Sequence, residues 1–338
     1  MNENCCCHVF KAAPTMFKVS SRLNLADYLG IIRVRLGIAR DSYQVKPGLY
    51  AVGNPGNDSE VLVSANYKLS FDYLRRELKG RDLWILVLDT NGVNVWCSAG
   101  KGVFSSSAIL DLIKQTKLPG LVNHRRLILP QLSAPGVCAH EVKRKTGFSV
   151  IYGPVRAFDL PRFLDNDLKA DEKMRRVGFT LGQRLAVVPV ALKIAGKYLV
   201  LFLALTALLL VIKGQLNPAN LLAKALPVSG AFLCGSVLVP IVLPWIPFRS
   251  FVLKGWLLGF CWAIACALLF GFTFWNWLAG LLFLPVLTAV LALNYTGCST
   301  FTSQNGVNRE IKLFARPLGL AALAGFIFFV TGQIVHFF

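Results

Sequence analysis

Charged residues are scarce in this chain, and acidic residues are almost absent from its second half. Of the 338 residues, 55% are hydrophobic and only 16% are charged. Beyond Arg184 the sequence has nine Lys and Arg residues and a single acid, Glu310. This composition excludes one soluble globule and predicts a soluble N-terminal half followed by a membrane half, with the boundary between residues 170 and 190.

A secretory signal pattern is also missing. Met1–Lys18 has no basic start followed by an apolar stretch and a cleavage site, so we expect a cytoplasmic soluble half with reduced thiols. Cys5–Cys7 and His8 are soft-metal ligands, but adjacent cysteines cannot close a tetrahedral site alone. A disordered tail and a metal site therefore both stay open for this segment.

The formal net charge of +19 does not indicate nucleic-acid binding, because no stretch interleaves basic and aromatic residues in a known nucleic-acid motif. The cations lie in the soluble half and beside apolar stretches, where a lipid bilayer is the simpler partner. We expect most of them, including Lys143–Lys145, to lie on a solvated or lipid-facing surface, and we expect no nucleic-acid partner.

Five apolar stretches have about the 20 residues that a membrane-spanning helix needs. They are 186–212, 226–247, 251–272, 274–293 and 318–337. None has a central Asp, Glu or Arg, which an ion-coupled transporter would usually need, so an anchor or docking platform is favoured over a pump. The connection 294–316 is rich in hydroxyl and amide groups, and both a plain loop and part of a site remain open for it.

The charges of the connecting loops predict the orientation. With the soluble half inside, the inner loops hold Arg249, Lys254, Arg309, Lys312 and Arg316, and the outer loops hold only Lys213 and Lys224. By the positive-inside rule, this places the protein in the cytoplasmic (inner) membrane with its C-terminus outside.

The soluble half alternates short apolar runs with amphipathic stretches between Tyr50 and Asp167, which predicts alternating strands and helices. Runs such as Leu83–Leu88 suit strands buried on both faces, so we expect a Rossmann-like α/β domain with a parallel sheet. The expected organisation is an N-terminal extension (1–45), the α/β domain (46–170), a linker (171–185) and an all-α transmembrane bundle (186–338).

The segment after Leu83–Leu88 is the candidate site, since parallel sheets bind ligands beyond the carboxyl ends of their strands. It reads DTNGVNVWCSAGKG and is expected to enter a helix from about Val103. Small residues here allow backbone to approach a bulky ligand. Cys97, close to a helix start and to Lys101, is placed to ionise, and the thiolate is the form that binds metal. The alternative is that Trp96 and Cys97 are ordinary core residues.

The string NVWCSAGK closely resembles the NVWCAAGK cap-helix motif of the mercury-methylation family of corrinoid proteins (HgcA). The order of a soluble domain followed by membrane helices is also similar. The resemblance implies a domain similar to that of the corrinoid iron–sulfur protein, with cobalamin or a related corrinoid as cofactor and Cys97 as the lower axial ligand of cobalt. It further implies that residues around Cys97 form the cofactor face. They are Thr90, Val93, Asn94, Val95, Trp96, Ser98, Ala99, Gly100 and Lys101, with Ser98 replacing the family's alanine.

The resemblance also implies the activity: a methyltransferase that passes a methyl group from the corrinoid to Hg(II). A thiolate below cobalt is a strongly donating ligand, which suits transfer of methyl to an electrophilic metal. The chain has no Asp-x-His-x-x-Gly string to supply a histidine ligand, and no spaced cysteines for an iron–sulfur cluster. The implied partners are a small ferredoxin with two 4Fe–4S clusters as reductant, and a methyl-donor protein or methyl-folate.

Two other functions remain open. The first is a membrane-anchored corrinoid methyl carrier with a non-mercury acceptor. The second is a membrane scaffold or transport component whose soluble domain binds a ligand without catalysis.

Overall fold

The computed structural model describes residues 16–271, 273–296 and 299–335, so the segment with Cys5–Cys7 and His8 lies outside them. The chain divides into two compact units. The first is Met1–Val34 with Ile38–Val177, and the second is Arg35–Gly37 with Gly178–Phe338.

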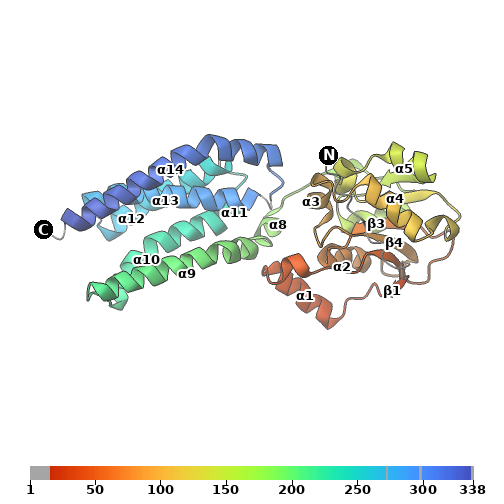
Figure 1. Ribbon diagram of the computed structural model, residues 1–338, viewed down its shortest axis with the longest axis horizontal. Coiled ribbons are helices and arrows are strands. Elements are labelled where there is room, and N and C mark those ends of the chain that lie inside the picture. Colours follow the sequence, from red (N-terminus) through yellow and green to blue (C-terminus); the bar gives the residue numbers. More distant parts are fainter. Residues whose placement is uncertain (1–15, 272, 297–298, 336–338) are drawn as a thin grey trace, which may run out of the picture. The chain divides into compact units, whose positions relative to one another are not determined.

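A six-stranded sheet forms the centre of the first unit (Figure 1), with strand order β1-β2-β4-β3-β5-β6. Its strands are β1 (Phe17–Val19), β2 (Gly48–Val52), β3 (Val61–Ala65), β4 (Leu83–Leu88), β5 (Arg126–Leu129) and β6 (Ser149–Tyr152). β4, β3, β5 and β6 run parallel, whereas β2 pairs antiparallel with β4, and β1 runs parallel to β2.

The sheet is thus mixed, and the prediction of a parallel sheet is wrong at β2, while β1 lies in the segment that was expected to be an extension. The reason is the connection between β2 and β3, residues 53–60, which contains no helix. Parallel strands need a crossover of roughly a dozen residues or more. This connection is shorter, so the chain reverses direction between β2 and β3.

Helices cover both faces of the sheet. On one face, α3 (Val95–Gly100), α4 (Ser106–Gln115) and α5 (Ala139–Thr146) contribute buried side chains such as Ile109 and Val142. On the other, α2 (Lys68–Glu77) and α6 (Leu160–Asp165) contribute Phe71 and Phe163. All six residues of β4 are buried, because alternate side chains enter the two cores. This confirms the predicted doubly covered strand.

The remaining elements of the first unit are short. They are η1 (Arg40–Ser42), η2 (Leu118–Gly120), η3 (Gln131–Gly136), η4 (Ala157–Asp159) and α7 (Glu172–Arg175).

One helix, α1 (Leu25–Arg35), lies within the segment expected to be an extension, and most of it belongs to the first unit. Its start is capped reciprocally: Asn24 N donates to Asp27 Oδ2 (3.0 Å), and Asp27 N donates to Asn24 Oδ1 (2.9 Å). Gly30 allows α1 to approach Tyr43, since a Cβ there would lie 2.2 Å from the phenol oxygen.

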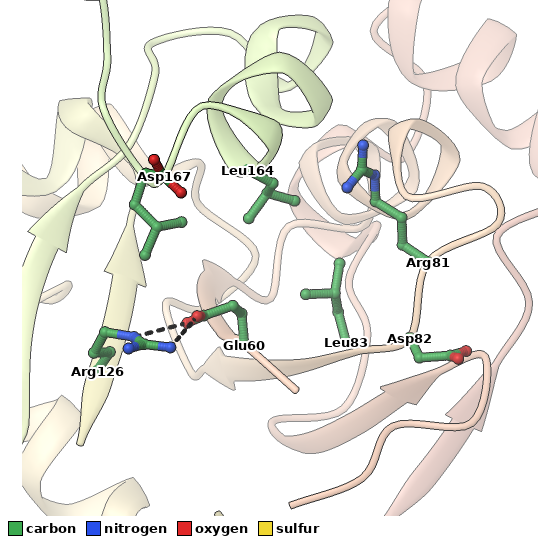
Figure 2. A pocket seen from close by; sticks show the side chains of 8 residues that line it. Glu60, Arg81, Asp82, Leu83, Arg126, Leu164 and Asp167 are labelled. Carbon is green, nitrogen blue, oxygen red and sulfur yellow. Dashed lines mark hydrogen bonds and ion pairs between the residues drawn. The ribbon is translucent and has the colours of Figure 1, made fainter. Parts of the chain in front are cut away.

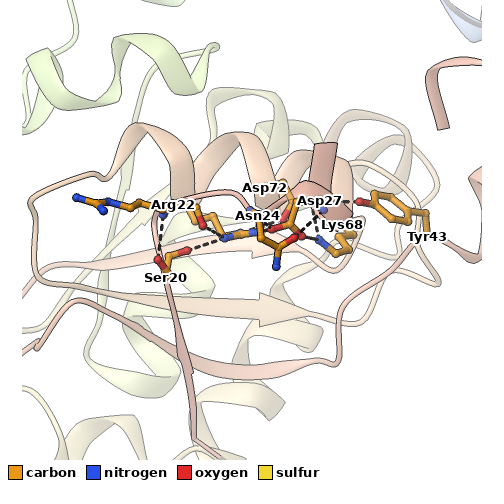
Figure 3. A network of polar contacts seen from close by, with 8 residues as sticks. Ser20, Arg22, Asn24, Asp27, Tyr43, Lys68 and Asp72 are labelled. Carbon is orange, nitrogen blue, oxygen red and sulfur yellow. Dashed lines mark hydrogen bonds and ion pairs between the residues drawn. The ribbon is translucent and has the colours of Figure 1, made fainter. Parts of the chain in front are cut away.

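A buried network of charges holds α1 against α2 (Figure 3). Asp27 accepts from Lys68 Nζ and from Arg75 Nη2, both at 2.6 Å. Asp72 accepts from the same two residues, at 2.7 Å from Lys68 Nζ and 2.9 Å from Arg75 Nε. Arg75 Nη1 also donates to the backbone oxygens of Ser20 (2.6 Å) and Arg22 (3.1 Å). Two carboxylates and two cations thus balance one another.

This network predicts a loss of stability in acid. Burial raises the pKa of Asp27, but hydrogen bonds from Lys68, the Asn24 backbone and Arg75 outweigh it, and the pKa falls from 3.8 to about 2. A carboxyl with a lowered folded-state pKa stabilises the fold above its unfolded pKa, and this stabilisation is lost as pH falls through the folded value. We expect a loss of about 2 kcal/mol between pH 4 and pH 2.

The measurement is urea-dependent hydrogen exchange of α2 in the full chain, repeated across this pH range. The control is Asp27→Asn, which should be less stable at pH 7 but lose less on acidification. An equal acid slope in the parent and in Asp27→Asn would contradict the assignment to Asp27.

Among the described residues, the second unit contains five helices that are long and apolar enough, by length and composition, to cross a membrane, as predicted. The first consists of α8 (Leu181–Leu185) and α9 (Val188–Ile212). The second consists of α10 (Pro218–Leu233), the π-helix η5 (Cys234–Leu238) and α11 (Val239–Val242). The remaining three are α12 (Phe251–Phe270), α13 (Phe274–Tyr295) and α14 (Gln304–Val335).

Two predicted boundaries differ from the structure. The second apolar helix begins at Pro218, before the expected 226, with Asn217 capping it by accepting from Asn220 N (2.7 Å). The expected loop 294–316 is largely helical, because α14 begins at Gln304. Its acid Glu310 accepts from Ser250 Oγ (2.9 Å) and Val252 N (3.1 Å), so a polar stretch that reads as a loop is helix tied to the start of α12.

Candidate functional site

The candidate segment leaves the sheet at the edge where β3, β4, β5 and β6 all have their carboxyl ends. From β3 the chain passes to β4, which is the neighbour of β3 on one side. From β4 it passes to β5, which is the neighbour of β3 on the other side. The order therefore reverses at β3, and such a switch point is where open α/β sheets bind ligands.

Asn66, the residue directly after β3, organises this segment. It is 1% exposed. Its Oδ1 accepts from Thr90 N (3.0 Å), Thr90 Oγ1 (2.8 Å) and Gly92 N (3.0 Å). Its Nδ2 donates to Asp89 Oδ1 (3.0 Å) and Gln44 Oε1 (3.2 Å). Sequence reasoning missed this residue, although an amide side chain immediately after a buried apolar strand was a usable signal.

The turn that follows is tight. Asn91 and Gly92 both have positive φ, at 54° and 70°, a pair of conformations that Asn-Gly adopts readily. A Cβ on Gly92 would also lie 3.2 Å from the Asp41 backbone oxygen. Thr90 is fully buried, and its hydroxyl lies 2.6 Å from the Val93 carbonyl oxygen. Thr90 and Val93 therefore shape the turn.

A helix begins earlier than expected. The sequence predicts a start near Val103, but α3 spans Val95–Gly100 and the longer α4 begins only at Ser106. Asn94 caps α3, since its Oδ1 accepts from Cys97 N (2.9 Å). The prediction was wrong because the cap lies in the side chain of Asn94, and glycines at positions 100 and 102 read as a loop. Cys97 is consequently a residue of the helix itself.

The two sides of α3 have different surroundings. Trp96 is 39% exposed, Gly100 and Lys101 are exposed, and Cys97 is half-buried. Ser98 and Ala99 are buried, and α3 packs against η3. Ser98 Oγ lies 2.7 Å from the Asn94 oxygen and 3.0 Å from the Val95 oxygen, so its hydroxyl is used inside the helix. Ser98 and Ala99 are thus packed inward, and their part in the ligand face stays a prediction.

The backbone of Cys97 is held by hydrogen bonds, whereas its thiol accepts and donates none within the described residues. Its N–H is held by Asn94, and its carbonyl accepts from Lys101 N (3.1 Å). Within the described residues no hydrogen bond reaches its sulfur. Nor do those residues contain a group of three or more His, Cys, Asp or Glu side chains able to hold a metal ion.

A second thiol, Cys138, lies at the same edge of the sheet, just before α5. It is exposed, and its N–H donates to Ser106 Oγ (2.8 Å). Nearby, Tyr152 OH donates to the Val137 oxygen (2.8 Å), and burial together with Cys138 raises the pKa of this phenol. Cys138 is a natural comparison for Cys97 because it shares the edge but not the motif.

A cavity of about 550 Å³ lies at the opposite edge, where β3, β4 and β5 begin (Figure 2). Its lining is strongly charged, with Glu60, Arg81, Asp82, Arg126 and Asp167. Three of these charges are already paired: Arg126 with Glu60 (2.5 Å), and Arg81 with Asp165 outside the lining (2.7 Å). Because it lies at the amino ends of the parallel strands and its arginines are neutralised, we do not place the functional site there.

The hydrogen bonds of Asn66 predict that Asn66→Ala loosens the candidate segment. The change leaves the N–H groups of Thr90 and Gly92 without their acceptor, and a buried unsatisfied donor costs about 1–3 kcal/mol. We expect the segment Asp89–Gly100 to lose about 3 kcal/mol of protection in hydrogen exchange of the full chain.

The matched control is Asn123→Ala. Asn123 is exposed and makes one side-chain bond, to Asp58 Oδ1 (3.0 Å). It should change protection by less than about 0.5 kcal/mol. Unchanged exchange over residues 89–100 in Asn66→Ala would show that the turn does not depend on this amide.

Comparison with known proteins relates the first unit to one family. Residues 26–164 match the family described as the CO dehydrogenase/acetyl-CoA synthase delta subunit. Among curated proteins, the chain is similar to acetyl-CoA decarbonylase/synthase complex subunit gamma. The protein from Methanopyrus kandleri is 34% identical over 130 residues, which are 38% of this chain and 28% of that protein. The Archaeoglobus fulgidus protein is also 34% identical over 130 residues, 38% of this chain and 27% of its own length.

The residues matched by the family model belong almost entirely to the first unit. In Methanothermobacter thermautotrophicus the match is 31% identical over 144 residues, 41% of this chain and 31% of that protein. The chain thus spans less than a third of the length of these relatives. The residues that the family model matches, 26–164, include most of α1, the strands β2 to β6 and the segment around Cys97.

Proposed function

We propose that the α/β unit binds a corrinoid at the carboxyl edge of its sheet and that the chain is a membrane-anchored, corrinoid-dependent methyltransferase. The observation that carries the proposal is the position of Cys97: a half-buried thiol on α3, free of hydrogen bonds in the described part of the chain, at the switch point of the sheet. The similarity to subunits of acetyl-CoA decarbonylase/synthase complexes supports the same function.

The residues around Cys97 fit a large, flat ligand. A Cβ placed on Gly100 or Gly102 would meet no atom within 4 Å, so the chain leaves open space there. Trp96 offers a partly exposed aromatic surface, and Lys101 offers a cation. A bound corrinoid would supply cobalt as the carrier of the methyl group.

Each residue of this chain then has a definite task. Cys97 would hold the corrinoid through its sulfur, and the thiolate would donate electron density to cobalt. Asn94 fixes the backbone of Cys97, while Thr90 and Val93 shape the turn that Asn66 secures. Val95 is partly buried and packs against the core that includes β4, so it anchors α3 to the unit.

For the acceptor, we propose Hg(II), because the string from Asn94 to Lys101 resembles the mercury-methylation motif in all but Ser98. The buried, internally bonded hydroxyl of Ser98 leaves the ligand side of α3 unaltered. The reductant would be a small ferredoxin with two 4Fe–4S clusters, and the methyl donor a protein or methyl-folate. The α/β unit would face the cytoplasm from the inner membrane.

A second candidate has specific support. The curated relatives are named as subunits of a complex that makes or cleaves acetyl-CoA, so a methyl carrier with a non-mercury acceptor is the alternative.

The test uses the full chain, purified in detergent from an anaerobic host that makes corrinoids. We expect cobalt and a corrinoid spectrum in proportion to protein, and methyl transfer to Hg(II) in preference to thiols and other metal ions. A preparation without cobalt would overturn the corrinoid proposal. Cobalt binding with transfer only to other acceptors would support the second candidate.

A further inference from the structure

Helix α1 turns several apolar residues outward, while its buried residues are Asp27 and Val34. Its inner side carries a charge, the buried Asp27, which is 8% exposed and ion-paired with Lys68 and Arg75. Its outer side carries apolar residues with helical spacing: Leu25 (75% exposed), Tyr28 (51%), Leu29 (52%) and Ile32 (55%). A surface helix ordinarily turns its apolar stripe to the core.

Ion pairs fix this orientation. Rotating α1 to bury Leu29 and Ile32 would remove Asp27 from both of its cations and leave Lys68 and Arg75 next to Asp72 alone. Breaking such buried pairs is strongly unfavourable. The outward direction of the apolar stripe is therefore built into the packing of the first unit.

The charge around the stripe indicates what covers it. Arg22 precedes the helix and Arg33 lies within it, and both are exposed. The acid of the helix, Asp27, is buried and neutralised, so the exposed charge of α1 is positive. An apolar stripe flanked by cations is the pattern of a helix that lies in the surface of an anionic bilayer.

Chain connectivity places a bilayer within reach. The first unit continues into the second at Val177–Gly178, and the first helix able to span a membrane begins at Leu181. At its other end α1 stops at Arg35, and Arg35–Gly37 already belong to the second unit. The links between the two units are therefore only a few residues long, and each residue reaches at most roughly 3.5 Å.

We propose that the outer stripe of α1 (Leu25, Tyr28, Leu29 and Ile32) is a membrane-docking surface that lies in the headgroup region of an anionic phospholipid bilayer. Apolar side chains enter the boundary with the acyl chains, and Arg22 and Arg33 meet lipid phosphates. The α/β unit is then held on the membrane by a second contact in addition to its link to the spanning helices. This proposal does not depend on the nature of the ligand bound near Cys97.

The test places an environment-sensitive fluorescent amino acid at Ile32 in the full chain, reconstituted in nanodiscs of phosphatidylglycerol and phosphatidylcholine. The matched probe replaces Ser107, an exposed residue of α4. We expect blue-shifted emission at Ile32 and quenching by doxyl-labelled lipids, with little change at Ser107. Nanodiscs of phosphatidylcholine alone, or the pair Arg22→Glu and Arg33→Glu, should weaken the quenching.

Three outcomes would overturn the proposal. One is water-like emission at Ile32 in anionic nanodiscs. Another is a blue shift that grows with protein concentration in detergent, which would assign the stripe to a second copy of the chain. The third is equal quenching at Ile32 and Ser107. Unchanged hydrogen exchange of α2 would verify that the probe at Ile32, an exposed position, leaves the ion-pair network intact.

Discussion

Replacing Cys97 with alanine is expected to change the spectrum of the bound corrinoid and to reduce the rate of methyl transfer by at least roughly 10- to 100-fold. Removing a residue that only supports a metal ligand typically costs this much, so removing the ligand itself should cost at least as much. The reason is that axial-ligand identity is the main influence of a protein on a cofactor metal. Cys97→His should keep a ligand but give a different spectrum and slower transfer, because imidazole donates less than thiolate.

The comparison variant is Cys138→Ala. Cys138 is also a free thiol at the carboxyl edge of the sheet, and it is more exposed than Cys97. It should keep the parent spectrum and rate, so a general effect of losing a thiol can be separated from loss of the ligand. If Cys97→Ala matched Cys138→Ala in both measurements, Cys97 would be an ordinary packing residue.

Asn66→Ala adds a diagnostic contrast. It leaves the Cys97 sulfur in place but removes the acceptor that orders Thr90 and Gly92. We expect weaker corrinoid binding with the parent spectrum in the protein that remains loaded. Loss of the ligand and loss of its support should thus be distinguishable.

Hydropathy predicted those elements in which side chains on all sides meet an apolar environment. Leu83–Leu88 is apolar throughout because both of its faces are covered, and the five long apolar helices need no knowledge of tertiary contacts. Direction within the sheet was not predictable in the same way. The antiparallel setting of β2 depends on its pairing with β4, more than thirty residues away along the chain, and apolar runs carry no sign of direction.

The features that the sequence did not predict depend on tertiary contacts or on a single side chain. α1 presents apolar residues outward and a charge inward, so periodicity does not reveal it as part of the α/β unit. The early start of α3 depends on one side chain, Asn94. For the site, the sequence singled out Cys97 and Asn94, whereas Asn66 acts across 24 residues to Thr90 and is recognisable only once β3 and β4 are adjacent.

The largest effect on stability is expected from Asp72→Ala. Asp72 is fully buried and accepts from Lys68 Nζ (2.7 Å), Arg75 Nε (2.9 Å) and Tyr43 OH (3.3 Å). Its loss leaves the 5%-exposed Arg75 with one carboxylate in place of two. Removing one partner of a buried ion pair typically costs 3–5 kcal/mol, so we expect about 4 kcal/mol. The measurement is urea-dependent hydrogen exchange of α1 and α2 in the full chain.

An exposed pair provides the control for Asp72→Ala. Glu141 and Lys145 are four residues apart on α5 and lie 2.8 Å from one another at the surface. Glu141→Ala should leave the stability close to that of the parent, since solvent screens such pairs. Combining Asp72→Ala with Arg75→Ala should cost less than the sum of the two single changes, because each alone strands the other charge. Additive losses would mean that Asp72 and Arg75 stabilise the unit independently, and the outward orientation of α1 would then need another cause.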